Sequence, residues 1–459
     1  MATINIKPSD IVRGESSEDY LTDGGFSPSS RHLNLTLKRG HVSFAEAPTD
    51  RGGATLSGTI IASCIDPAVT GNDRYLVDDE GGFYTLNGAT FTERQAAAAN
   101  YEYQLGTTDM IPFVDGNFYF TSKTTVGQFD NDMGTITEDW WSGLDSSYRH
   151  PVEVVEKELF IGDKNLVLFY DGTTSGTAFT LPAGQNITSL RKHPNGTTLL
   201  AFTGGTADFG HTRNGTAKVY YCDPTLRGAS IDGWTREVEI EAQVEGTRTV
   251  AGTVFTTWGK NFGFFDGNGL QFLKNLETST TTYSQNITNM EDIVVYRDGL
   301  NGVAYGDLGA GRVFWKLYHN ATNSSNIDHI AYKGDNVLLI AYEDGTAGNL
   351  EEVDYDNQGV TGQFLSNRIA FESKTQMNGI DIIHDVTNSA GTTSFSLSSR
   401  DTEDTDNFIE TRSYVNQEAV KSEFDYTETV DFFQFKLVPS QDTLAYKLFR
   451  IKYDSTPAK

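Results

Sequence analysis

Asp-Gly pairs between short β-rich runs recur along most of this 459-residue chain. They stand at Asp115-Gly116, Asp171-Gly172, Asp266-Gly267, Asp298-Gly299 and Asp344-Gly345. Asp-Gly supplies the positive φ angles of tight hairpin turns, so each copy predicts two antiparallel strands. Hairpins repeated roughly forty residues apart are typical of propeller blades rather than of a sandwich. We therefore expect an all-β chain whose central part is a β-propeller.

The predicted hairpin units follow one another from about residue 56 to 357 and favour a six- or seven-bladed ring. The 28 Phe and 21 Tyr, set against 11 Pro, favour strands over helices. Neither a Trp-Asp repeat nor the sialidase-type Asp box recurs, so no named propeller signature is met. The one plausible helical piece is the run from Thr92 to Ala99, which is too short to anchor a helical domain.

The two ends of the chain differ from this middle part. Residues 1–55 are expected to form an extended arm, which either closes the fold on itself or docks on a neighbouring subunit. Residues 358–459 contain strands of alternating polarity joined by long acidic connections, and predict a β-sandwich appended to the propeller. The expected order is therefore arm, propeller and sandwich.

The chain carries 62 acidic and 35 basic side chains, a net charge of −27. Such a charge argues against a surface whose role is to grip nucleic acid or an anionic membrane. It is compatible with a passage through which DNA slides, because an acidic wall does not hold DNA. The first residues lack a secretory core and no apolar stretch is long enough to span a bilayer, so we expect no membrane anchor. Cys64 and Cys222 cannot form a disulfide framework, and Cys64 is expected to be a buried thiol.

The usual catalytic and ligand-binding motifs are absent. No histidine pairs with another His or Cys at a metal-ligand spacing, and there is no nucleophile elbow, phosphate-binding loop or dinucleotide fingerprint. The run from Asp130 to Gly134 resembles the opening of a calcium loop but lacks its later ligands, so we interpret it as an Asx-rich turn. We expect no catalytic residues, no metal and no cofactor.

The most suggestive side-chain cluster is Glu138-Asp139-Trp140-Trp141. Two carboxylates beside two aromatic rings could serve a glycan site, in which the rings stack on a sugar. The alternative, which we favour, is that Trp140 and Trp141 fill a gap between blades or rest on a neighbouring subunit.

The order of parts resembles the tail-hub proteins of short-tailed bacteriophages, the packaged-DNA stabilisation family. The closest local likeness lies near the C-terminus, in the run from Ser394 to Asp401 with Phe408 after it, and in the closing strand Leu448 to Lys452. The arm's Asp23-Gly24-Gly25-Phe26 and Leu33-Asn34-Leu35 also resemble openings of phage virion proteins. The likeness spans most of the chain in layout, although it is poor in motifs.

This resemblance implies a non-enzymatic virion protein, made in the host cytoplasm, that assembles in rings below the portal or its adaptor and helps retain or pass the genome. Its implied partners are other copies of itself, the portal or adaptor, other tail proteins and, transiently, the viral genome. The expected subunit contacts are Asp23, Gly24, Gly25, Phe26 and Arg31. Two alternatives stay open: a receptor-binding or glycan-cleaving propeller of a phage tail, and a bacterial ligand-binding propeller unrelated to phages.

Overall fold

The computed structural model describes most of the chain. The described residues are 2–6, 29–33, 35–36, 43–44, 48–51, 56–65, 74–97, 102–104, 108–204, 217–228, 233–276, 287–298, 301–307, 312–316, 327–334, 337–344, 347–354, 363–366, 369–386, 392–398, 410–415, 421–424, 429–439 and 444–454. Two compact units share them: residues 49–302 with 320–352, and residues 1–48 with 303–319 and 353–459.

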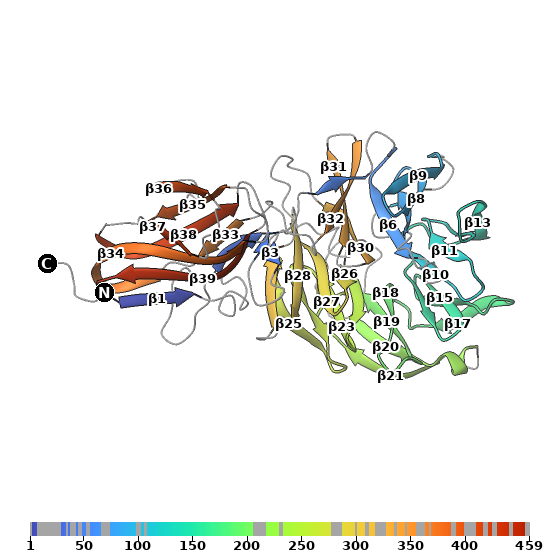
Figure 1. The fold of residues 1–459 in the computed structure, drawn as a ribbon. Coiled ribbons are helices and arrows are strands. Elements are labelled where there is room, and N and C mark those ends of the chain that lie inside the picture. Colours follow the sequence, from blue (N-terminus) through green and yellow to red (C-terminus); the bar gives the residue numbers. More distant parts are fainter. Residues whose placement is uncertain are drawn as a thin grey trace. The chain divides into compact units, whose positions relative to one another are not determined.

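The first of these units is a ring of antiparallel β-sheets, and the strands of each of the first five sheets are consecutive in the chain (Figure 1). The first three blades are β6 (Ile60–Ile65), β7 (Arg74–Asp78), β8 (Phe83–Asn87) and β9 (Thr90–Gln95); β10 (Met110–Pro112), β11 (Phe118–Thr121), β12 (Thr125–Phe129) and β13 (Ile136–Ser142); and β14 (Val152–Val155), β15 (Glu158–Asp163), β16 (Leu166–Tyr170) and β17 (Ser175–Thr180). The next two are β18 (Asn186–Lys192), β19 (Leu199–Gly204), β20 (Lys218–Cys222) and β21 (Trp234–Glu239); and β22 (Gly246–Val250), β23 (Thr253–Trp258), β24 (Asn261–Phe265) and β25 (Leu270–Asn275).

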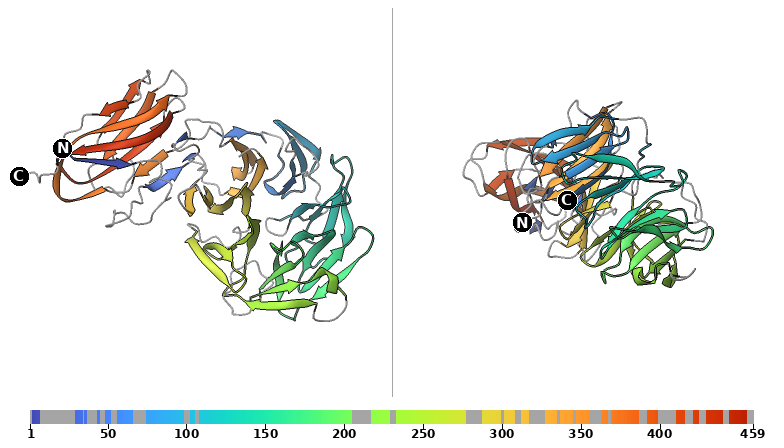
Figure 2. Two further views of the ribbon diagram at one scale, coloured as in Figure 1. Left: turned by 60° about the horizontal axis from the view of Figure 1, so that its bottom comes forward. Right: turned by 90° about the vertical axis from the view of Figure 1, so that its right-hand side faces the viewer.

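Blade six contributes the antiparallel pair β26 (Ile287–Met290) and β27 (Ile293–Asp298) to this unit. Blade seven contains β30 (Ile327–Gly334), β31 (Val337–Asp344) and β32 (Ala347–Asp354), and its outer strand is β5 (Thr49–Asp50). In Figure 2 the blades follow one another around a ring, from blue through green to orange. The fold of this unit is therefore a seven-bladed β-propeller, and seven is one of the two blade counts, six or seven, that the repeated hairpins predict.

Blade seven closes the ring with a strand from the other end of the propeller. β5 pairs antiparallel with β32, through Glu351 opposite Asp50 and Glu352 opposite Thr49. The next residue, Arg51, donates its backbone N–H to Leu350 at 2.8 Å. Residues 49 and 50 fall in the segment that the sequence assigned to the arm, and here they complete a blade.

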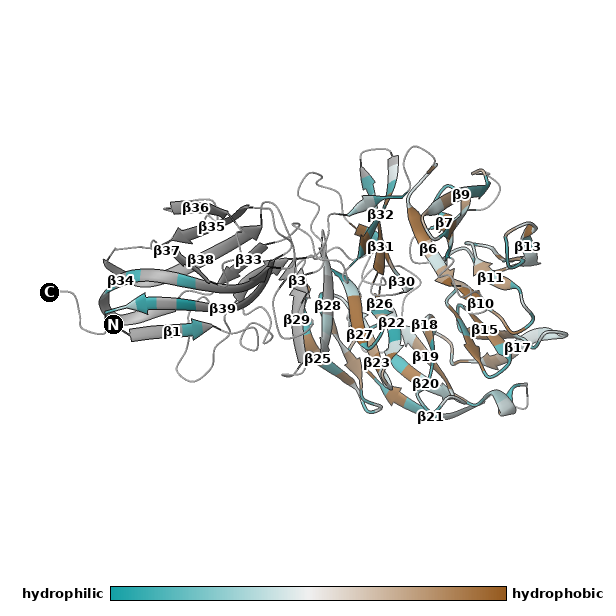
Figure 3. Cartoon of the chain, viewed as in Figure 1, coloured by the Kyte–Doolittle hydropathy of each residue, from teal (hydrophilic) through white to brown (hydrophobic). Residues whose placement is uncertain are grey.

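The hydrophobic core lies between neighbouring blades. Alternate residues of one strand face opposite ways, and in β11 Phe118 and Phe120 pack with blade one while Tyr119 packs with blade three. Both faces of a middle strand are thus buried. This explains why the middle strands are nearly unbroken runs of apolar residues. In Figure 3 the strands β6 and β31 are largely brown, whereas the outer strand β9 is largely teal.

Three of the five predicted Asp-Gly turns lie among the described residues and form as expected, whereas Gly299 and Gly345 lie outside the described residues. Gly116, Gly172 and Gly267 have φ of 88°, 95° and 92°, values that suit glycine. A similar turn forms where no glycine follows the Asp. There the Asp side-chain oxygen accepts hydrogen bonds from backbone N–H groups of the turn. Asp130 Oδ1 accepts from the backbone N–H groups of Gly134 and Thr135 at 2.7 and 3.2 Å, which confirms the Asx-rich turn.

The helix expected over 92–99 is wrong. Residues 92–95 belong to β9, whose Gln95 pairs with Phe83 of β8, and Ala98 and Ala99 lie outside the described residues. Phe91 stacks on Tyr84 with ring centroids 5.1 Å apart. Pairing with β8 and this stack outweigh the helix propensity of a short alanine-rich run. A 3-10 helix, η3, spans Pro224–Leu226, and no helix in the described ranges is long and apolar enough to cross a membrane.

The second unit combines both ends of the chain. Its strands are β1 (Ala2–Ile6), β2 (Ser29–Leu33), β3 (Leu35–Thr36), β4 (Ser43–Phe44), β28 (Asn301–Asp307), β29 (Arg312–Lys316), β33 (Gln363–Ser366), β34 (Ile369–Val386), β35 (Thr392–Ser398), β36 (Glu410–Val415), β37 (Lys421–Phe424), β38 (Thr429–Pro439) and β39 (Leu444–Tyr453). β1 pairs antiparallel with β39, so the first and last strands of the chain are neighbours. Lys452 Nζ of β39 forms an ion pair with Oδ1 of the buried Asp381 of β34, at 2.6 Å. A sandwich arrangement of this unit remains a prediction.

Candidate functional site

The propeller encloses a cavity of about 470 Å³ lined by the inner strand of every blade. These strands are β6, β10, β14, β18, β22, β26 and β30. The volume lies in the range of small-molecule sites, about 300–1,000 Å³. Because inner strands alternate between the cavity and the blade interior, small polar residues such as Ser189, Thr247 and Thr288 reach the lining.

Four arginines line this cavity although the chain as a whole is strongly acidic: Arg74, Arg149, Arg191 and Arg248. Arg191 Nη1 forms an ion pair with Glu153 at 3.0 Å, and its Nε donates to Thr247 Oγ1 at 3.0 Å. Arg149, which is 5% exposed, donates from Nη1 to the Glu245 carbonyl oxygen at 3.2 Å. Burial lowers the pKa of Arg149 to about 10, since the charge is removed from water.

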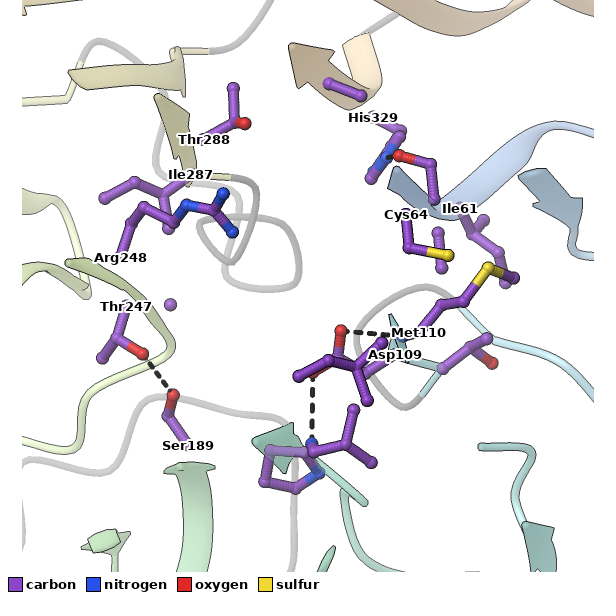
Figure 4. Close-up of a pocket in the computed structure, with 18 of the residues that line it drawn as sticks. Ile61, Cys64, Asp109, Met110, Ser189, Thr247, Arg248, Ile287, Thr288 and His329 are labelled. Carbon is purple, nitrogen blue, oxygen red and sulfur yellow. Dashed lines mark hydrogen bonds between the residues drawn. The ribbon is translucent and has the colours of Figure 1, made fainter. Parts of the chain in front are cut away.

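Arg248 is bound by a neutral partner. Its Nε and Nη2 both donate to Asn289 Oδ1, at 3.0 and 2.7 Å. Burial, and then the nearby charge of Arg191, lower the pKa of Arg248 to about 10. In Figure 4 the Arg248 guanidinium points from its strand toward the interior of the cavity, with Asp109 on the opposite wall.

Arg74 differs from the other three arginines in its hydrogen bonding. It is 5% exposed, and its Nε has no hydrogen-bond partner among the described residues. Burial lowers the pKa of Arg74 to about 9, and the charge of Arg248 acts in the same direction. Arg74 comes from blade one and Arg248 from blade five, so two cations act on each other from separate parts of the ring.

Two carboxyl groups, Asp109 and Glu245, also line the cavity. The Asp109 carboxylate accepts from its neighbours' backbone, with Oδ1 receiving the Met110 N–H at 2.9 Å and Oδ2 the Val152 N–H at 3.2 Å (Figure 4). Burial raises the pKa of Asp109, and the charges of Arg191 and Arg248 oppose that rise. Asp109 therefore ties β10 to β14 as well as facing the arginines.

A Ser-His pair lies in the same wall. Ser63 Oγ and His329 Nε2 are 2.9 Å apart, which joins blade one to blade seven. Burial, and then the charge of Arg74, lower the pKa of His329 to about 3. A general base works best when its pKa lies near the ambient pH, so this histidine is neutral but a poor acceptor of the Ser63 proton. Cys64, next to Ser63, is a buried thiol that forms no disulfide, as expected.

The predicted cluster at residues 138–141 lies elsewhere, on the outer strand β13 of blade two. Glu138 accepts from Gln95 Nε2 at 2.9 Å through Oε1, and from the Tyr103 hydroxyl at 2.5 Å through Oε2. Trp140 packs against Tyr119 and against Tyr170 of blade three, with ring centroids 4.9 and 4.8 Å apart. The structure therefore places Trp140 between two blades, and Asp139 is exposed beside it.

Of the predicted subunit contacts, Asp23, Gly24, Gly25 and Phe26 lie outside the described residues. Arg31 lies in β2, where its backbone is opposite Leu365 of β33. The cavity residues were missed by the sequence interpretation, because Arg74, Arg191 and Arg248 are isolated in sequence. The available signal was the small polar content of the first strands of blades four and five, seen in Thr188-Ser189 and Gly246-Thr247.

Comparisons with known proteins give a limited result. No protein-family model matches the chain, and no curated protein matches it. Among solved structures, a chain of "Crystal Structure of Mitotic Checkpoint Complex" is 11% identical, over 68% of this chain and 94% of that one, with a TM-score of 0.42. A chain of "YCF48 bound to D1 peptide" is 12% identical, over 67% of this chain and 94% of that one, also with a TM-score of 0.42. Likeness at this level carries no argument about function, and the seven-bladed assignment rests on the strand pairing itself.

Proposed function

We propose that this chain is a non-enzymatic structural protein of a bacteriophage virion, a ring-forming tail hub or connector component that takes part in retaining and passing the genome. The observation that carries the proposal is the order of parts. The two ends of the chain belong to one β-rich unit, and a seven-bladed propeller is inserted between them. A propeller between two β-rich ends is compatible with the tail-hub layout that the sequence resembles, in which the arm and the sandwich stay predictions.

The dimensions of the cavity specify how such a protein would act on DNA. A volume of about 470 Å³ is far too small for a duplex, whose major groove alone is about 12 Å wide. The genome would therefore pass through an opening made between copies of the chain. A net charge of −27 on every copy would keep the wall of that opening from holding the phosphate backbone.

The residues of the alternative glycan site favour a structural role. Both carboxylate oxygens of Glu138 accept hydrogen bonds from blade-one and linker residues. Trp140 buries one part of its ring on Tyr119 and Tyr170, so that part cannot stack on a sugar. These contacts support packing between blades as the use of this cluster.

The oligomeric state tests the proposal. Native mass spectrometry and negative-stain electron microscopy of the purified chain should give a closed ring of identical copies, and mass analysis of virions should find the chain in particles. A protein that is strictly monomeric and missing from particles would contradict the proposal.

A reducing-sugar assay tests the glycan alternative. We expect no sugar release from bacterial surface polysaccharide by the wild-type chain. Reproducible release that Glu138→Gln or Asp139→Asn abolishes, while the exposed-site variant Glu237→Gln retains it, would replace the structural proposal with an enzymatic one.

A further inference from the structure

We propose that the central cavity of the propeller binds a small molecule carrying a phosphate or carboxylate group, held by Arg74 and Arg248. Both chemistries present an oxyanion, and guanidinium groups recognise either one through paired N–H donors. The inference concerns the isolated propeller and does not depend on assembly into a ring.

Within the described ranges, Arg74 and Arg248 are cations that no carboxylate contacts directly. Among the described residues, no carboxylate lies within ion-pair distance of Arg74 or Arg248, whereas Arg191 has Glu153 at 3.0 Å. The Arg74 Nε is buried and has no acceptor in the described part of the chain. The acceptor for Arg248 is the neutral amide oxygen of Asn289. The charges of Glu153 and Asp109 act on Arg248 only from beyond ion-pair distance. A buried cation without a carboxylate in direct contact is costly, and a bound anion would lower that cost.

Arg74 and Arg248 reach the same cavity from different blades. Both arginines line one cavity, and they belong to blades one and five. Their charges act on each other, so a ligand between them would replace a repulsion with two attractions. Ser63, Ser189 and Thr247 also line the cavity and supply hydroxyl groups for the rest of a polar ligand.

The positive charge of the cavity contrasts with the net negative charge of the chain. The chain carries 62 acidic against 35 basic side chains, so anions are repelled from it in general. Saturable binding of an anion at one site would therefore require a local positive field. The cavity supplies one, since among the described residues four arginines line it and two carboxyl groups do, those of Asp109 and Glu245.

Isothermal titration calorimetry with the full chain tests this inference, using inorganic phosphate and citrate as separate probes. We expect one site per chain for at least one probe. Tighter binding of phosphate would assign the site to a phosphate group, and tighter binding of citrate would assign it to an organic acid. Absence of saturable binding for both probes at millimolar concentration would overturn the inference.

Two variants locate the site. Arg74→Gln and Arg248→Gln should each weaken binding of the better probe at least tenfold, because each removes one of the two holding cations. Arg94→Gln on the exposed outer strand β9, whose Nε donates to Thr85 at 3.0 Å, should bind like the wild type. Equal affinity of the wild type and both cavity variants would show that the anion binds elsewhere and would overturn the assignment.

A thermal-shift measurement guards against misfolded variants. The better probe should raise the melting temperature of the wild type and of Arg94→Gln, since a ligand that binds only the folded state stabilises it. The two cavity variants should melt cooperatively without that rise. A full rise in a cooperatively melting Arg74→Gln or Arg248→Gln would contradict the proposal.

Discussion

Arg51 and Glu352 lie 301 residues apart in the sequence and form a two-point ion pair, with Nε to Oε2 and Nη2 to Oε1 both at 3.0 Å. Lys333 Nζ adds a third contact to Glu352 Oε2 at 2.5 Å. Although burial acts against it, hydrogen bonds from Arg51 and Lys333 hold the pKa of Glu352 below its usual range. The pair fastens β5 to β32 at the point where the ring closes.

Glu352→Gln should therefore destabilise the propeller. The change leaves two cations without a counter-ion where the Arg51 and Glu352 side chains are only 22% and 12% exposed. We expect a loss of about 2 kcal/mol in the free energy of unfolding, measured by urea denaturation. The control is Glu102→Gln, which breaks the ion pair with Lys123 at a side chain that is 72% exposed; its loss should stay below about 0.5 kcal/mol. Equal losses would show that closure does not depend on this pair.

Gly267→Ala should cost more stability than Gly269→Ala. Gly267 has φ of 92°, which strains any residue with a Cβ atom, and an added Cβ at Gly269 would meet nothing within 4 Å. We expect a loss of about 1–2 kcal/mol for the first change and a much smaller effect for the second. The midpoints of urea unfolding of the two variants measure the difference. Similar midpoints would show that blade five does not depend on a positive φ at this Asp-Gly turn.

His329 should make stability fall in mild acid. Its folded-state pKa of about 3 lies below the unfolded value of about 6.5. The unfolded chain therefore binds a proton between these values that the folded chain does not, and stability is lost as pH falls through that window. Between pH 7 and 5 we expect a loss of about 1–2 kcal/mol from this residue.

The measurement for His329 is the difference in unfolding free energy between pH 7 and 5, by urea denaturation, in the wild type and in His329→Gln. The variant should lose less stability than the wild type over this interval. Asp328 changes the unfolding free energy in the opposite direction. Burial raises its pKa to about 6, so the stability that it contributes is lost as pH rises. Asp328→Asn should accordingly steepen the acid loss. Parallel profiles for the wild type and His329→Gln would contradict the assignment.

Trp140→Ala should lower stability by about 2–3 kcal/mol, because the ring packs on Tyr119 and Tyr170 across two blades. Phe272→Ala is the matched control, since that ring is 54% exposed and its removal should change little. Chemical denaturation of both variants is the measurement. A stable Trp140→Ala chain would reopen the glycan interpretation of the cluster.

The turns were the predictable part of the fold, because Asp-Gly at positions such as Asp171-Gly172 constrains the backbone locally. The blade count followed once strands paired, as the sequence alone left six and seven open. β5 was not predictable as a blade strand, since two residues have no period of their own. The helix expected over 92–99 failed because pairing with β8 decides that segment.

The cavity was beyond the reach of sequence interpretation for a different reason. Alternation predicts that residues such as Ser189 and Arg191 of β18 share one side of a strand. It does not reveal that the facing wall carries Arg74 and His329, which come from distant blades. Convergence of inner strands is a property of the closed ring, and no local pattern encodes it.

Closure by β5 has a consequence for how the chain is made. The strand that finishes blade seven leaves the ribosome before blade one, and its partner β32 emerges some three hundred residues later. Until then the earlier blades are an open arc whose exposed edge can pair with other chains. Synthesis of this protein should thus depend on chaperones during translation, and premature termination before β32 should yield an aggregating product.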